Sequence, residues 1–443
     1  MIITRRRFLQ GVGATGVLAA VGCGSKTGGP SLVPPIPVPA KPILVVVDID
    51  GGNDWLNMMP PLSGTNRSVY QSKRPNLAVP TDQTTGLANG AGLNANFAEM
   101  ADLDAQGRVA WFPGIGMNNP NLSHFVSIDL WGQGAAQPGG TGWLGRFADQ
   151  AFDVRGDVLR GLTVTSDRPV MLRGATRSFV SITSASGFVY PSWLRSARVG
   201  APYDPQLLED GFAAAVTSTT ADPASALDYA SAALSGKLFL DAQNGFGTNG
   251  TLPARAPSVP YPGDADYTLK RTNGGNLSST LSSQFKLIAQ MLGAGLPSEI
   301  FFTRLGGWDT HSSQALDHPN LMRALGGSIR AFYDDLASVQ TADGNAQERV
   351  MILAWSEFGR RVAENDGGTD HGTAGLSFCV GRAVHGGTYS DYPDLSRLDG
   401  NGNMRHTVDF RSVYATVLDR WLGQDPAASD AMLGATYPRL GFL

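Results

Sequence analysis

Short apolar runs rich in β-branched residues alternate with helical segments along this chain of 443 residues. Runs of this kind predict strands that are buried on both faces, because a half-exposed strand would alternate apolar with polar residues. The expected strands and helices fall at 43–47, 97–103 (helix), 108–112, 281–292 (helix), 299–303, 321–339 (helix), 350–354 and 410–422 (helix). The alternation predicts an α/β fold with a largely parallel central sheet and helices on both faces.

Residues 43–443 are expected to form a single domain. The stretch 204–265 departs from the alternation: it is Ala/Ser-rich and helical at first, and it becomes rich in proline and glycine from residue 245. We interpret this stretch as a helical insertion or lid within that domain.

The first 22 residues resemble a twin-arginine export signal, with Arg5, Arg6 and Arg7 before Phe8 and a short Gly/Ala-rich apolar run. That run is too short and too glycine-rich for a stable transmembrane helix. The pattern predicts export through the twin-arginine machinery to the periplasm or the outer face of a membrane.

Residues 20–23 resemble a lipobox, which predicts that Cys23 carries a lipid and anchors the protein to the membrane. The alternative is a plain cleaved signal in which Cys23 is incidental. Residues 23–42 are then a tether, first Gly/Ser-rich and then proline-rich, which favours an extended spacer.

The charge and the cysteines restrict the partners further. The formal net charge is −4, it becomes more negative once the arginines of the leader are removed, and the rest of the chain has no basic cluster. Nucleic acid is therefore not expected as a partner, and electrostatic membrane binding is not expected either. Besides Cys23 the chain has only Cys379, which lies in an apolar run and is expected to be inert packing.

Polar, glycine-rich clusters follow the expected strands. They comprise residues 48–54, 118–125, 306–311 and 356–361, with 368–372 soon afterwards. Because parallel strands end at one edge of a sheet, these segments are expected to meet there and to form a ligand crevice.

The residue types in these clusters favour divalent metal ions. Carboxylates and neutral imidazoles bind zinc, manganese or iron, and carboxylates also bind calcium. Only six histidines exist, and three of them, His124, His311 and His371, fall inside the clusters. Two metal ions close together could bind a substrate, activate a nucleophile and stabilise the leaving oxygen, so we expect two.

The motifs GGND, NPNLSHF, GTGWLGR, GGWDTH, SEFGRR, GTDHGTAG and DFRSVYATVLDRWLG resemble, in this order, the domain of unknown function 1501 family. The resemblance spans essentially the whole chain after the tether. That family is grouped with the alkaline phosphatase and sulfatase superfamily, so the resemblance implies an alkaline phosphatase-like fold and hydrolysis of phosphate or sulfate esters. The sequence contains neither Cys-x-Pro-x-Arg nor Ser-x-Pro-x-Arg, which argues against formylglycine sulfatase chemistry.

The resemblance also implies roles for individual positions. It implies metal ligands at Asp54, Asp309, His311, Glu357, Asp370 and His371. It also implies a catalytic role for Ser123, in the approximate place of the nucleophile, and for His124 beside it, as an acid/base or alternatively as a ligand. The Asp309/His311 pair departs from the superfamily pattern, because it is separated by one residue and not by three.

The remaining polar residues of the clusters are predicted to bind substrate. Arg360 and Arg361 could hold an anionic group in a bidentate manner, and Asn53 lies beside the expected ligand Asp54. Each prediction has an ordinary alternative. Asp54 could cap a turn, Glu357 could pair with either arginine, and Ser123 could be the N-cap of a helix.

Three functions remain open from the sequence. The leading hypothesis is an exported, lipid-anchored, metal-dependent hydrolase of small or polymeric anionic esters, with attack by Ser123 or by a metal-activated water. The alternative is a non-catalytic binding or structural lipoprotein with a degenerate fold of this type. A metal-free esterase using Ser123 and a histidine is disfavoured, because no Gly-x-Ser-x-Gly motif is present.

Overall fold

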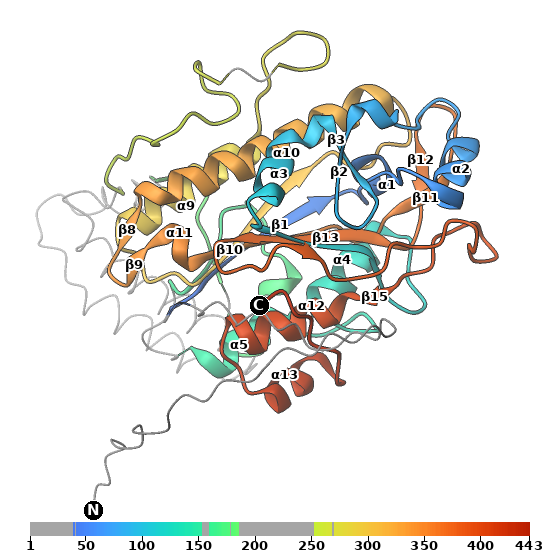
Figure 1. Ribbon diagram of the computed structural model, residues 1–443. Helices are drawn as coiled ribbons and strands as arrows, with labels where there is room; N and C mark the ends of the chain where they lie inside the picture. Colours follow the sequence, from blue (N-terminus) through green and yellow to red (C-terminus); the bar gives the residue numbers. More distant parts are fainter. Residues whose placement is uncertain (1–38, 40, 153–158, 178, 186–251, 268–269) are drawn as a thin grey trace, which may run out of the picture. The chain divides into compact units, whose positions relative to one another are not determined.

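The computed structural model describes residues 39, 41–152, 159–177, 179–185, 252–267 and 270–443 (Figure 1). The predicted export signal, Cys23 and nearly all of the tether lie outside these residues, as does most of the predicted insertion at 204–265. Among the described residues, no helix combines the length and the hydrophobicity that crossing a bilayer requires. The fold below concerns one compact unit, Pro35–Leu443.

Within the described residues, nine strands form the main sheet, in the order β14-β4-β13-β10-β1-β7-β5-β6, with β15 beside β4. Their bounds are β1 Ile43–Asp50, β4 Val109–Gly116, β5 Gly161–Thr163, β6 Val180–Ser181, β7 Ile300–Gly306, β10 Val350–Trp355, β13 Gly375–Gly381, β14 Gly387–Thr388 and β15 Val408–Asp409. The predicted strands at 43–47, 108–112, 299–303 and 350–354 are confirmed as β1, β4, β7 and β10.

The sheet is mostly parallel, as predicted, with β1 central between β7 and β10. The exception is β13, which runs antiparallel to both of its neighbours, β10 and β4. An antiparallel strand begins at the edge where its neighbours end. The chain just before β13 therefore lies at the edge formed by the ends of β1, β4, β7 and β10.

Three small two-stranded sheets accompany the main one: β2 Thr84–Gly86 with β3 Gly92–Asn94, β8 Gln340–Thr341 with β9 Gly344–Asn345, and β11 Arg360–Glu364 with β12 Thr369–His371. In the third of these, Arg360 is the register partner of His371. This hairpin occupies the chain between β10 and β13, which places it at the edge described above.

The helices are α1 Trp55–Met58, α2 Gly64–Lys73, α3 Ala98–Ala105, α4 His124–Gln133, α5 Trp143–Ala151, α9 Thr280–Gly293, α10 Gln314–Asp335, α11 Ala346–Arg349, α12 Phe410–Thr416 and α13 Pro426–Leu433. Short 3₁₀ or π-helical turns adjoin α3, α10 and α12. Helix α10 begins earlier than the predicted 321–339 and contains Pro319 in its second turn, where the missing N–H removes one backbone hydrogen bond.

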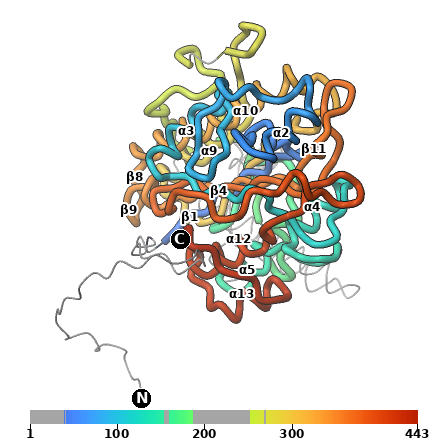
Figure 2. The backbone as a smooth tube through the Cα atoms, turned by 45° about the vertical axis from the view of Figure 1, so that its right-hand side comes forward, coloured from blue at the N-terminus to red at the C-terminus, as the bar shows by residue number. Residues whose placement is uncertain are grey.

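Alternate side chains of β1 pack on opposite faces of the sheet. Val45 and Val47 join the core that α3, α9 and α10 cover, while Leu44 and Val46 join the core under α4, α5 and α12. Figures 1 and 2 show α9 and α10 on one side of the strands and α5, α12 and α13 on the other. Both faces of the sheet are thus covered by helices, which explains why β1 is apolar at nearly every position.

Candidate metal centre

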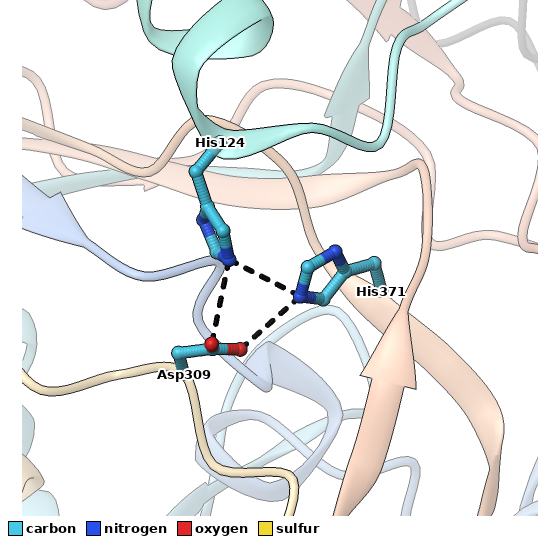
Figure 3. Close-up of side chains that lie close together, drawn as sticks. All are labelled: His124, Asp309 and His371. Atoms are coloured by element: carbon cyan, nitrogen blue, oxygen red, sulfur yellow. Dashed lines mark hydrogen bonds and ion pairs between the residues drawn. The ribbon is translucent and has the colours of Figure 1, made fainter.

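Three side chains from distant parts of the chain meet at the edge where the parallel strands end (Figure 3). His124, Asp309 and His371 each present a ligand atom, and these atoms all lie within 4.8 Å of one another. The two histidine Nε2 atoms are 3.1 Å apart, and the Asp309 carboxylate lies 3.1 Å from His371 Nε2 and 3.5 Å from His124 Nε2.

His311 lies beside two members of this group. Its Nε2 lies 2.9 Å from His371 Nε2 and 3.0 Å from an Asp309 carboxylate oxygen. Neighbouring donors that share one ion at about 2.0–2.1 Å are about 2.8–3.4 Å apart, depending on the coordination geometry. His311 Nε2, His371 Nε2 and the Asp309 oxygen therefore have the spacing of neighbouring ligands.

The outer nitrogen of each imidazole faces an acceptor. His124 Nδ1 lies 2.6 Å from Glu357 Oε1, His371 Nδ1 lies 2.8 Å from the Leu122 carbonyl oxygen, and His311 Nδ1 lies 3.5 Å from Asp370. The partners of His124 and His371 favour a proton on Nδ1 of these two rings, which leaves a lone pair on each of their Nε2 atoms. Lone pairs that face one another at about 3 Å repel, so the arrangement favours a cation between them.

The candidate ligands come from three segments that the fold brings together. His124 opens α4 after β4, Asp309 and His311 follow β7, and His371 ends β12. A close approach at Gly51 makes this possible, since a Cβ there would lie 2.5 Å from the Asp309 backbone nitrogen. Its φ of +130° is also one that side chains rarely adopt.

Glu357 lies behind His124 and is not among the converging ligand atoms. Its buried carboxylate accepts hydrogen bonds from the Gly51 N–H at 3.0 Å and from the Ser356 hydroxyl. The hydrogen bond to Glu357 raises the pKa of His124, although burial acts in the opposite direction. Glu357 thus orients His124 and increases its basicity, and it does not occupy the ligand position that the sequence predicted.

Arg360 is buried and holds the Asp309 carboxylate. Its guanidinium also donates to the carbonyls of Gly51, Gly52 and Thr369. Burial would raise the pKa of Asp309, but the hydrogen bond and charge of Arg360 lower it to about 2. The structure therefore gives Arg360 a different role from the predicted substrate contact: it keeps Asp309 ionised.

Asp54 and Asn53 lie in a buried network behind the centre. Both Asp54 oxygens accept from Arg74, at 2.6 and 2.9 Å, and Gln314 donates to the same carboxylate. Asn53 Oδ1 lies 3.0 Å from His318 Nε2. The structure does not bring either residue to the cluster, since side chains just after β1 point into the protein here.

The other predicted residues are arranged around the centre. Ser123 occupies the N-cap position of α4, is exposed, and makes no side-chain cap hydrogen bond. Asp370 accepts from Asn365 Nδ2 at 2.8 Å and faces His311. Arg361 is half-buried, and its carbonyl accepts from Arg74.

Phe358 is a contact that the sequence did not single out. Its ring centroid lies 4.9 Å from that of His124 and 4.8 Å from that of His371, and its side chain is buried. It follows Glu357 directly in the SEFGRR motif, which is the one signal that could have indicated it. Packing against both rings limits their rotation.

Part of the chain matches a known protein family. Residues 279–431 match the family described as Protein of unknown function (DUF1501). This region contains Asp309, His311, Glu357 and His371, whereas His124 lies outside it. The match supports the DUF1501 assignment over a shorter stretch than the motifs suggested. No curated protein matches the chain.

Proposed function

We propose that this chain is a metal-dependent hydrolase of anionic esters, of the phosphate or sulfate class, with its centre at His124, Asp309, His311 and His371. The observation that carries the proposal is the convergence of ligand atoms of His124, His371 and Asp309 within 4.8 Å of one another, with His311 Nε2 2.9 Å from His371 Nε2. The ester class comes from the resemblance to the alkaline phosphatase and sulfatase superfamily.

The donor set fits one ion of zinc, manganese or iron. Three imidazole nitrogens and a carboxylate are suitable ligands for these metals, whereas calcium prefers six to eight oxygens. Within the described residues, no second group of three or more His, Cys, Asp or Glu side chains converges in this way. The proposal is therefore one ion, where the sequence predicted two.

A divalent ion at this centre would polarise an ester oxygen and lower the pKa of a bound water. The protein's own part is to orient the ligands and to leave the centre open. Glu357 and the Leu122 carbonyl fix two rings from behind, and Arg360 keeps Asp309 charged. The Asp309 side chain is 47% exposed and that of His311 is 43% exposed, so a substrate can reach this side of the centre.

Elemental analysis of the protein from Gly24 onward tests the proposal, followed by assays with phosphate and sulfate esters. We expect about one equivalent of zinc, manganese or iron, because the cluster supplies a single set of ligands. Metal-dependent ester hydrolysis would support the function. A protein that takes up no metal from any of these salts would overturn it.

A non-catalytic metal-binding protein is the second candidate. It is favoured by Arg360, the residue best suited to hold an anion, whose guanidinium is fully engaged by backbone carbonyls and Asp309. A protein with a full equivalent of metal that cleaves neither phosphate nor sulfate esters would select this candidate.

We further propose that the protein is exported and held at a membrane by a lipid on Cys23, on the evidence of the leader sequence. Cys23→Ser is expected to move the protein from the membrane fraction to the soluble fraction, because a single anchor site is removed. Fractionation of the producing cells, with Cys379→Ser as the matched control, measures this. If Cys23→Ser stays with the membrane, the anchor is elsewhere.

A further inference from the structure

Phe125 is unusually exposed for an aromatic residue. Its relative exposure is 85%, and among the described residues only Leu316, at 49%, is another exposed large hydrophobic side chain. Single exposed apolar residues are common and need no special explanation. The case for Phe125 therefore depends on its position.

Phe125 directly follows the ligand His124 in the first turn of α4. In a helix the Cα–Cβ bonds tilt toward the N-terminus, so its ring leans toward the end of α4 from which His124 enters the centre. Figure 3 shows His124 extending from this end of α4 toward Asp309 and His371. Phe125 thus lies at the solvent side of the same helix end.

The segment that carries Phe125 is held firmly at two points. His371 Nδ1 lies 2.8 Å from the Leu122 carbonyl oxygen, and His124 Nδ1 lies 2.6 Å from Glu357. In addition, the Ser127 hydroxyl donates to the carbonyl of Asn121. The backbone that carries Phe125 is therefore fixed, so little backbone mobility would be lost when the ring binds an apolar group.

Leu316 differs in its surroundings. It lies on α10, where Gln314 and His318 face inward to Asp54 and Asn53. Leu316 is two positions from each of these and so lies on the opposite side of the helix. It points away from the network behind the centre, which makes it a suitable comparison for Phe125.

We propose that Phe125 is a specificity-determining residue that packs against an aryl or alkyl group of the substrate while the anionic group binds at the centre. This inference rests on the proposed function and narrows its substrate class to esters with an apolar substituent. Contact between two phenyl rings that removes about 50–60 Å² of apolar surface from water is worth about tenfold in affinity.

Titration of the zinc-loaded protein with phenylphosphonate and methylphosphonate tests the inference without requiring catalysis. The wild-type protein is expected to bind phenylphosphonate about tenfold more tightly, because only this ligand reaches Phe125. Phe125→Ala should remove the preference, Phe125→Leu should keep part of it, and Leu316→Ala should leave it unchanged. Equal affinity of the wild-type protein for both ligands, or a preference that persists in Phe125→Ala, overturns the inference.

Two further measurements separate this inference from its alternatives. Metal content is determined on the same samples: a protein that takes up no zinc, manganese or iron overturns the proposed function, whereas a metal-loaded protein without the preference for phenylphosphonate overturns only the role of Phe125. Flotation with neutral phosphatidylcholine vesicles tests whether Phe125 instead contacts a lipid surface. Vesicle binding that is lost in Phe125→Ala would overturn the inference and assign Phe125 to a lipid surface.

Discussion

His371→Ala is expected to weaken metal binding more than any other single substitution at the centre. The His371 Nε2 lies 3.1 Å from His124 Nε2, 2.9 Å from His311 Nε2 and 3.1 Å from Asp309, so it is the atom that all the other ligands share as a neighbour. Loss of a residue that hydrogen-bonds to a ligand typically lowers metal affinity about 10–100-fold, and loss of a ligand itself should lower it by more than about 100-fold. Competition with a chromophoric chelator measures the dissociation constant.

His385→Ala is the matched control, because His385 lies beyond the opposite end of β13 from His371. It should bind metal as the wild-type protein does. Glu357→Gln should have a metal affinity between those of His371→Ala and His385→Ala. We expect it to bind metal about 10–100-fold more weakly than the wild-type protein, since the ligand His124 remains while its charged partner is removed. Wild-type affinity in His371→Ala would contradict the assignment of this centre.

Arg74→Met is expected to destabilise the fold by about 3–5 kcal/mol, because it leaves the buried carboxylate of Asp54 without its charged partner. Both side chains are almost completely buried, and two hydrogen bonds join them, at 2.6 and 2.9 Å. Arg74 also donates to the carbonyls of Val362 and Arg361. Urea denaturation of the metal-free protein measures the free energy of unfolding.

The destabilisation caused by Arg74→Met should depend on pH in a definite direction. Burial alone would raise the pKa of Asp54, but Arg74 and Gln314 hold it below the ordinary 3.8. A lowered pKa means that the stabilisation is present above pH 3.8 and disappears as the pH falls through the lower value. The difference in the free energy of unfolding between Arg74→Met and the wild-type protein should therefore become smaller as the pH falls.

The double variant Asp54→Asn/Arg74→Met serves as the control for charge, and it should be more stable than Arg74→Met at neutral pH. Asp54→Asn also tests the earlier expectation of a metal ligand at this position. If Asp54→Asn loses metal while its free energy of unfolding is unchanged, Asp54 is a ligand and the role proposed here for the Arg74 pair is wrong.

The alternation of strands and helices could be predicted from the sequence, because strands buried on both faces leave unbroken apolar runs. Those runs located β1, β4, β7 and β10 within a few residues. The reversed direction of β13 could not be predicted, since an apolar run carries no information about strand direction. The apolar run that contains Cys379 forms this strand, and only its register with β10 and β4 shows that it is antiparallel.

The grouping of His124, Asp309, His311 and His371 followed from a simple rule, that parallel strands end at one edge. The rule could not say which polar residues at that edge point inward. Asp54 and Arg360 have the residue types of a ligand and a substrate contact, yet both are buried in other interactions. Their partners, Arg74 and the carbonyls of Gly51 and Gly52, are far away in the sequence, so local patterns do not reveal them.

The separation of the ligands along the chain has a consequence for the order of events during biosynthesis. His124 and His371 are 247 positions apart, and the hydrogen bond from His371 to Leu122 spans 249. A ribosome must therefore complete more than four-fifths of the polypeptide before the full set of ligands exists. Under the proposed function, metal insertion is then a late event that follows synthesis of β12, and a chain truncated before that hairpin would lack His371 to hold the ion.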